Sequence, residues 1–244
     1  MLRAAFACLL AVGTALPSAT ATARAERPQP LPYIELVTGG AAADAALPLV
    51  IALHGRGDTA EAFASLFREL TVPARVAILR PPRPWGGGQA WFLGARAHAE
   101  NRPAIAAELL GLADRVVATA EAIRASRPTR GRAVVMGFSQ GGMLAWAIAV
   151  KQPRAFAAVF PLAGFLFPEM LEHVRVDAAA MPPIVAFHGD ADPLVPVDED
   201  RKGVRALEKR GGRAELRVYP GVGHELPPPL RRDFFTSLAQ ALAR

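Results

Sequence analysis

The sequence predicts a three-layer α/β domain built around a mostly parallel central sheet. Two observations lead to this fold class. Short, continuous apolar runs recur along the chain, and segments with the spacing of an amphipathic helix lie between them. Strands buried on both faces produce such runs, and parallel neighbours need a long, usually helical, crossover. With 52% apolar residues over 244 positions, the chain can fill one core of this kind.

Seven segments are candidate strands. Continuous apolar runs predict central strands, and more alternating segments predict strands near an edge of the sheet. The central candidates are 49–53, 76–79, 133–136, 157–160 and 184–187, and the edge candidates are 33–37 and 214–218.

Helical patterns separate these strands. A first helix is expected near 58–70, where Asp58 and Glu61 form a candidate capping pair. Longer patterns predict helices at 105–123, 143–150 and 230–242. The stretch between the strands at 157–160 and 184–187 leaves room only for a short cap over the sheet, not for a lid domain.

Residues 1–25 have the features of a cleaved signal peptide. Arg3 precedes an apolar run over 4–16, and Ala23 and Ala25 flank a small-x-small cleavage site. The run is shorter than the ~20 residues that cross a bilayer, so stable membrane insertion is not expected. The sequence therefore predicts export to the periplasm or the exterior, and a single catalytic domain over 26–244.

The remaining composition narrows the chemistry. Cys8, the only cysteine, lies in the apolar N-terminal run, so the mature chain has no thiol nucleophile and no disulfide. The formal net charge is +6, but the Lys and Arg residues are scattered without interleaved aromatic residues. This distribution is typical of a solvated surface and does not predict nucleic-acid binding.

The strongest functional motif is Gly-Phe-Ser-Gln-Gly-Gly at 137–142, between an expected strand and an expected helix. G-x-S-x-G in this position is a nucleophile elbow, in which glycines allow a turn so sharp that the hydroxyl of Ser139 stands clear of the sheet. The alternatives are a chance glycine-rich turn and a phosphate loop. No Lys-Ser/Thr pair follows the glycines, which excludes the phosphate loop.

A serine hydroxyl needs a base, and the base needs an orienting acid. In this type of site the chain order is Ser, then Asp or Glu, then His. His224 is the best candidate base, because it lies in a loop between the last expected strand and the last helix, whereas His173 has no such setting.

Two aspartates compete for the role of the acid in His-Gly-Asp-Ala-Asp-Pro-Leu-Val-Pro at 188–196. The segment resembles the pattern H-G-x-x-D-x-x-V-P of many hydrolases with a nucleophile elbow, and this resemblance implies that Asp192 is the acid, whereas Asp190 is expected to brace the turn. The His188-x-Asp190-x-Asp192 spacing could also indicate a metal site, but no further ligand cluster supports one. We therefore expect no metal and no other cofactor.

The negative charge of a tetrahedral intermediate requires two backbone N–H donors. One is expected at Gln140, directly after the nucleophile, and the other in the loop 53–58 after the first buried strand. The tripeptide Arg-Gly-Asp at 56–58 could alternatively be a cell-adhesion motif. His54 precedes Ser139 and is expected to be structural.

Four motifs together resemble the phospholipase/carboxylesterase family of the α/β-hydrolase superfamily, which includes the acyl-protein thioesterases. They are Leu-His-Gly-x-Gly-Asp at 53–58, the elbow at 137–142, the acid loop at 188–196 and Gly-His-Glu at 223–225. The resemblance implies an α/β-hydrolase fold and cleavage of esters or thioesters through an acyl-enzyme. It also implies that Ser139, Asp192 and His224 form a catalytic triad, and that the amides of Arg56 and Gln140 form the oxyanion hole.

The resemblance also points to an aromatic pair beside the acyl site, which Trp91 and Phe92 match, although Leu93 replaces the usual acidic residue. The cleft is expected to be open and apolar, and its candidate lining residues are Trp85, Trp91, Phe92, Phe165 and Leu194. Expected substrates are acyl esters of short or medium length, lysophospholipid or polyester fragments. A peptidase or a non-catalytic binding protein of the same fold remains an alternative, and nothing in the sequence indicates the oligomeric state.

Overall fold

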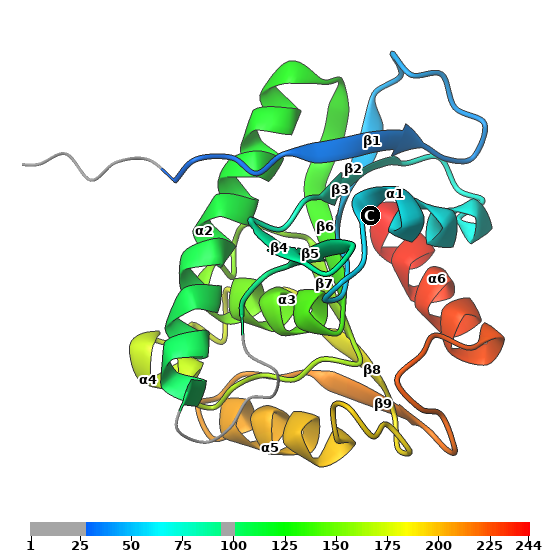
Figure 1. Ribbon diagram of the computed structural model, residues 1–244. Coiled ribbons are helices and arrows are strands. Elements are labelled where there is room, and N and C mark those ends of the chain that lie inside the picture. Colours follow the sequence, from blue (N-terminus) through cyan, green and yellow to red (C-terminus); the bar gives the residue numbers. More distant parts are fainter. Residues whose placement is uncertain (1–27, 94–100) are drawn as a thin grey trace, which may run out of the picture.

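A seven-stranded sheet forms the centre of the molecule in the computed structural model, which describes residues 28–93 and 101–244 (Figure 1). The strand order is β1-β3-β2-β6-β7-β8-β9, and every neighbouring pair is parallel except β1 with β3. The strands are β1 (Tyr33–Val37), β2 (Leu47–Leu53), β3 (Arg75–Leu79), β6 (Thr129–Phe138), β7 (Ala158–Leu162), β8 (Val185–Gly189) and β9 (Glu215–Tyr219).

All seven expected strands are present. The two segments with the more alternating patterns, β1 and β9, are the edges of the sheet and are mostly half-buried. The continuous apolar runs form the central strands, and β2 and β3 are buried over their whole length. The predicted α/β class with a mostly parallel sheet is confirmed.

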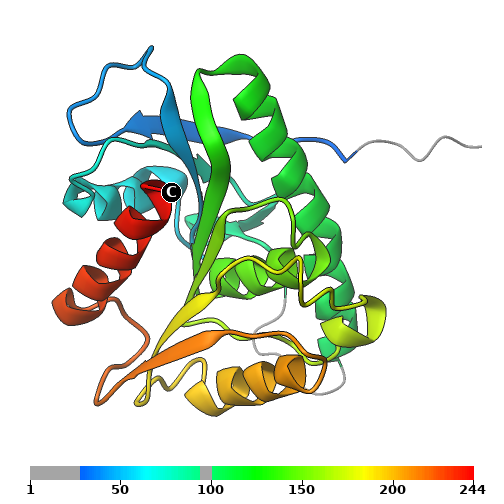
Figure 2. The ribbon, with the colours of Figure 1, turned by 180° about the vertical axis from the view of Figure 1, so that it is seen from behind.

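Helices cover both faces of the sheet (Figures 1 and 2). The first face carries α2 and α3 with α4 and α5, and the second carries α1, the short 3-10 helix η1 and α6. The helices are α1 (Ala60–Phe63), η1 (Ala64–Glu69), α2 (Arg102–Ser126), α3 (Gln140–Lys151), α4 (Met170–His173), α5 (Val197–Glu208) and α6 (Pro228–Leu242).

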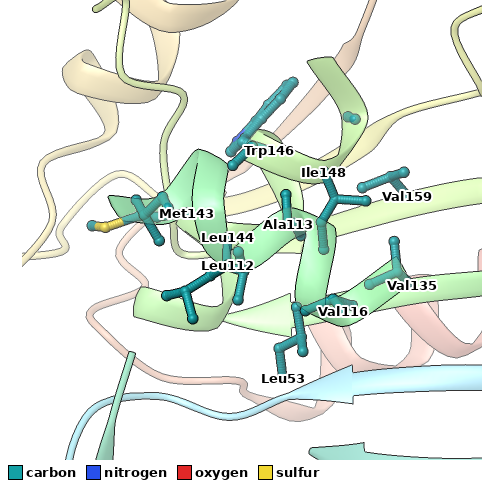
Figure 3. Close-up of a cluster of buried hydrophobic side chains, with 14 of the residues drawn as sticks. Leu53, Leu112, Ala113, Val116, Val135, Met143, Leu144, Trp146, Ile148 and Val159 are labelled. Carbon is teal, nitrogen blue, oxygen red and sulfur yellow. The ribbon is translucent and has the colours of Figure 1, made fainter. Parts of the chain in front are cut away.

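The side chains of β2 alternate between two cores. Leu53 points into the cluster under α2 and α3, whereas Ala52 points into the cluster under η1 and α6. Figure 3 shows the first cluster, where Val116 of α2 lies near Leu53 and Val135 of the sheet, and Ile148 of α3 lies near Val159. Burial of each large aliphatic side chain contributes about 1.5–3 kcal/mol, so this double core holds the sheet and the loops at its carboxyl edge in place.

Some local features differ from the expectations. Thr59, not Asp58, caps α1, because its hydroxyl accepts a hydrogen bond of 3.1 Å from Ala62 N, while Asp58 Oδ1 accepts from Thr59 N. A two-stranded hairpin of β4 (Arg83–Trp85) and β5 (Gly88–Ala90) occupies a segment in which the sequence predicted neither a strand nor a helix.

The proposed signal peptide, residues 1–25, lies outside the described residues. Within 28–93 and 101–244, none of the helices combines the length and the apolar character that a membrane span requires.

Candidate active site

Ser139 lies at the turn between β6 and α3 with φ 57° and ψ −118°. This backbone conformation is costly for a residue with a Cβ, by about 1–3 kcal/mol, and is typical of strained functional turns. The flanking glycines make the turn possible. A Cβ on Gly137 would lie 2.1 Å from Gly141 O, and a Cβ on Gly141 would lie 2.1 Å from Leu53 O.

Ser139, His224 and Asp192 form a continuous hydrogen-bonded chain. The Oγ of Ser139 lies 2.9 Å from Nε2 of His224, and Nδ1 of His224 lies 2.6 Å from Oδ2 of Asp192. A carboxylate only accepts, so Nδ1 carries the proton and Nε2 is left to accept from the serine hydroxyl. The ring of Phe138 packs against the imidazole of His224, with centroids 5.0 Å apart, and limits its orientation.

The carboxylate of Asp192 is buried and held from both sides. Its Oδ1 accepts from the backbone N–H groups of Leu194 and Val195 at 2.9 and 2.8 Å, and its Oδ2 faces His224. Asp190 has a different partner, because its Oδ1 accepts from Gly221 N at 2.7 Å. The structure thus brings Asp192 to His224, whereas Asp190 braces the loop that precedes His224 in the chain.

His188 is buried behind Asp192. Its Nδ1 lies 3.0 Å from Asp200 Oδ2, and its Nε2 lies 2.8 Å from Val195 O. Burial lowers the pKa of His188, but the carboxylates of Asp200 and Asp192 and the carbonyl of Val195 together outweigh burial and raise this pKa above its ordinary value. In the described part of the chain, no group of three or more His, Cys, Asp or Glu side chains is arranged to hold a metal ion.

His54 does not join the chain of hydrogen bonds. Its side chain is fully buried, and its Nδ1 lies 2.8 Å from Gly55 O. Burial lowers the pKa of His54 and so favours the neutral ring. Its backbone oxygen accepts from the indole N–H of Trp91 at 2.8 Å, which makes it a structural part of the loop after β2.

A cavity of about 500 Å³ opens beside Ser139 and is lined by both apolar and charged side chains. Phe92, Phe165 and Leu194, expected from the sequence, are among its lining residues, as are Arg56 and Gln140. The further lining residues are Gly55, Asp58, Arg102, Phe138, Met143, Pro193, Val195, Pro196, Glu199 and His224.

Two residues expected at the cleft wall lie elsewhere. Trp91 is fully buried behind the cavity, because the chain turns its indole inward to His54 O. Trp85 belongs to the β4–β5 hairpin, where its ring lies 5.0 Å from the guanidinium of Arg56, and it does not line the cavity. Neither tryptophan is therefore among the residues that line this cavity.

The side chain of Gln140 has a role that the sequence did not indicate. Its Oε1 accepts from Trp91 N at 3.0 Å, and its Nε2 donates to Phe92 O at 3.1 Å. These buried bonds tie the segment carrying Phe92 to the nucleophile elbow. The side chain thereby fixes one wall of the cavity.

Arg102 and Glu199 place charge at the cavity wall, and no motif signals them. Arg102 donates to Glu169 at 2.7 Å and to Glu199 at 2.9 Å. Its guanidinium also lies 5.4 and 5.1 Å from the rings of Phe165 and Phe167. A guanidinium between two carboxylates and two aromatic rings is strongly held, so this end of the cavity is rigid.

Comparisons with known proteins identify the family of this chain. A family model described as Phospholipase/Carboxylesterase matches residues 40–240. A probable inactive carboxylesterase from Oryza sativa subsp. japonica is 37% identical over 93 residues, which are 38% of this chain and 38% of that protein. Acyl-protein thioesterase 1 from Gibberella zeae is 29% identical over 102 residues, 40% of this chain and 43% of that protein. These matches thus span less than half the length of either relative.

Among solved structures, esterase PE8 has a TM-score of 0.70 at 25% identity, and the match covers 87% of this chain and 100% of that one. The family model spans most of the chain, including the nucleophile elbow, the acid loop and the histidine loop. The chain therefore belongs to the phospholipase/carboxylesterase family of the α/β-hydrolase fold.

Proposed function

We propose that the protein hydrolyses carboxylic esters or thioesters, with Ser139 as nucleophile, His224 as general base and Asp192 as orienting acid. The observation that carries the proposal is the hydrogen-bonded chain of these side chains, at 2.9 and 2.6 Å, beside a cavity lined by apolar and charged side chains. Membership of the family supports ester hydrolysis as the reaction class.

Acylation begins when Ser139 Oγ attacks the carbonyl carbon and its proton passes to Nε2 of His224. The imidazolium that forms is stabilised by the ionised Asp192, which keeps Nδ1 protonated. We assign the oxyanion hole to the backbone amides of Arg56 and Gln140, and the support is that both residues line the cavity beside Ser139. The intermediate then collapses, and the leaving alkoxide or thiolate takes the proton from His224.

Deacylation repeats these steps with water. His224 removes a proton from a water molecule, which attacks the acyl carbon of the ester on Ser139. When the second tetrahedral intermediate collapses, the carboxylic acid leaves and the serine oxygen recovers its proton from His224. The same residues thus serve both halves of the reaction.

The test is hydrolysis of p-nitrophenyl esters of two to eight carbons by the wild type and Ser139→Ala. We expect the substitution to lower kcat on the order of 10⁶-fold, because the triad acts as a unit. Ser126→Ala, at the exposed end of α2, is the matched control and should retain full activity. A fluorophosphonate should add one label to the wild type and none to Ser139→Ala, as seen by intact mass.

Equal activity of Ser139→Ala and the wild type would remove the proposal. Hydrolysis of peptide substrates at a higher kcat/KM than esters would favour a peptidase. A wild type that binds esters and never cleaves them would favour a binding protein. The relative from rice that is named a probable inactive carboxylesterase is the reason to include this outcome.

We also propose that residues 1–25 direct export and are then removed. The support is the basic start, the apolar run and the small-x-small site before Glu26. Expression of the full chain in a bacterium should yield extracytoplasmic protein whose intact mass corresponds to a chain that begins at Glu26. Recovery of full-length protein in the cytosol would count against export.

A further inference from the structure

A second imidazole–carboxylate pair lies directly behind the proposed catalytic acid and has no part in the reaction described above. His188 comes from the end of β8 and Asp200 from the first turns of α5, and both side chains are buried. Their separation, Nδ1 to Oδ2, is 3.0 Å. Ionisable groups in a core cost stability, and even a buried pair often stabilises a fold less than apolar side chains would. A role beyond stability is therefore expected for this pair.

The partners of the ring determine where one of its protons lies. Val195 O lies 2.8 Å from Nε2 of His188, and a carbonyl oxygen can only accept a hydrogen bond. Nε2 therefore carries a proton. Nδ1 and Asp200 Oδ2 share a further proton, which belongs either to an imidazolium beside a carboxylate or to a neutral ring beside a carboxylic acid.

The surroundings favour the imidazolium. Oδ2 of Asp192 lies 3.6 Å from Nε2 of His188, and its negative charge attracts a cation on this ring. The indole N–H of Trp146 favours the carboxylate form of Asp200 and so lowers its pKa. Burial raises the pKa of Asp200, and the pKa of His188 is also raised, so both shifts favour retention of the shared proton.

We propose that His188, held as an imidazolium by Asp200, is a positioning residue for Asp192. Its Nε2–H holds the carbonyl of Val195, whose own N–H donates to Asp192 Oδ1 at 2.8 Å. Its charge also faces the same Oδ2 atom that accepts from His224. The carboxylate is thereby fixed in place and kept ionised while His224 takes up and releases protons.

The first test is Asp200→Asn, which keeps the shape of the pair and removes the charge from both members. The amide can donate to Nδ1, so His188 becomes neutral and still holds Val195. We expect kcat for p-nitrophenyl butyrate to fall about 10-fold while KM stays within about twofold.

The pH profile separates positioning from a structural role. Without the positive charge behind Asp192, the protonated form of His224 is better stabilised, so it persists to higher pH. The acid limb of kcat/KM should therefore move upward by about half a pH unit to one unit. Among the described residues, the charged or polar groups facing His188 are Asp192, Asp200 and the carbonyl of Val195, with His224 beyond Asp192 and Trp146 beside Asp200.

Asp198→Asn is the matched control, because Asp198 is exposed on the same helix and pairs with Arg201. This variant should keep the kcat and the acid limb of the wild type. A folded Asp200→Asn with unchanged kcat and acid limb would overturn the proposal.

A second measurement decides the matter even if Asp200→Asn does not fold. In wild-type protein labelled with ¹⁵N-histidine, both ring nitrogens of His188 should give protonated shifts at pH 8. An unprotonated Nδ1 at that pH would overturn the proposal. The kinetic arm rests on the proposed function, whereas the NMR arm does not, so loss of the serine mechanism and loss of the imidazolium are distinguishable.

Discussion

The backbone N–H of Gly221, three residues before His224 in the chain, donates a hydrogen bond of 2.7 Å to Oδ1 of Asp190. Asp192, two residues further along, accepts instead from the ring of His224 at 2.6 Å. Neighbouring carboxylates in one turn thus hold the loop and the imidazole separately. Substituting each one in turn distinguishes these roles.

Asp192→Asn should leave the protein folded and lower kcat by about 10⁴-fold. An amide at this position favours the wrong imidazole tautomer, in which Nε2 can no longer accept the serine proton. Steady-state kinetics on p-nitrophenyl butyrate, with circular dichroism to verify folding, measures the effect.

Asp190→Asn is the matched control for this experiment. It keeps an oxygen that can accept from Gly221, so kcat should stay within about threefold and the free energy of unfolding within about 1 kcal/mol. A larger loss of kcat in this variant than in Asp192→Asn would mean that the acid has been assigned to the wrong aspartate.

Gly141→Ala should abolish stable folding or activity. The added Cβ would lie 2.1 Å from the carbonyl oxygen of Leu53, a backbone atom that cannot move without displacing β2. Thermal unfolding should show a loss of more than about 3 kcal/mol, at the upper end of what single substitutions cost.

The control for this glycine is Gly111→Ala on the exposed side of α2, where nothing lies within 4 Å of the added Cβ. Because alanine favours helix over glycine, this variant should gain about 0.5–1 kcal/mol. Equal stability of the two variants would show that the close approach at the elbow is not a constraint.

The parts of this fold that the sequence predicts are those whose cause is local. Continuous apolar runs mark β2 and β6 because both faces of these strands are covered, and the glycines around Ser139 mark the elbow because the turn forbids a Cβ. The ends of the strands depend more on distant contacts. Strand β6 extends over Thr129–Phe138, beyond the four apolar residues from which it was predicted.

The features that the sequence did not predict depend on distant partners. Helix α5 is mostly polar, yet it packs closely against Leu166. Gly203 makes this approach possible, because a Cβ at that position would lie 2.4 Å from Leu166 O. Arg102 meets Glu199 across 97 residues, a contact that only the completed sheet creates. Successive aromatic residues give no sign of which one faces a cavity, so Trp91 was misplaced while Phe92 was not.

Glu199→Gln should make stability less dependent on pH in the acid range. Burial alone would raise the pKa of Glu199, but hydrogen bonds from Lys202 and Arg102 outweigh it and lower this pKa below its ordinary value of 4.5. The stability contributed by this carboxylate is therefore present above about pH 4.5 and is lost as the pH falls through the lowered folded-state value.

Urea unfolding of the wild type and Glu199→Gln at pH 6 and pH 3.5 tests this sign. The wild type should have the higher midpoint at pH 6, and the gap should narrow at pH 3.5. A difference in midpoint that stays constant between the two pH values would mean that the ionised form of Glu199 adds nothing to the stability of the protein.

Leu194 provides the clearest test of how the cavity selects its acyl group. Its side chain is 65% exposed yet lines the cavity beside Ser139, so truncation removes apolar contact without opening the core. Each buried methylene contributes about 0.8 kcal/mol, or close to a fourfold change in affinity. Leu194→Ala should therefore raise KM about three- to fivefold for a p-nitrophenyl ester of six or more carbons and barely change it for the acetate.

Trp85→Ala, on an exposed residue outside the cavity, is the control, and its effect on KM should not depend on the length of the acyl chain. If instead Trp85→Ala carries the chain-length effect and Leu194→Ala does not, the acyl group lies against the hairpin and not in this cavity.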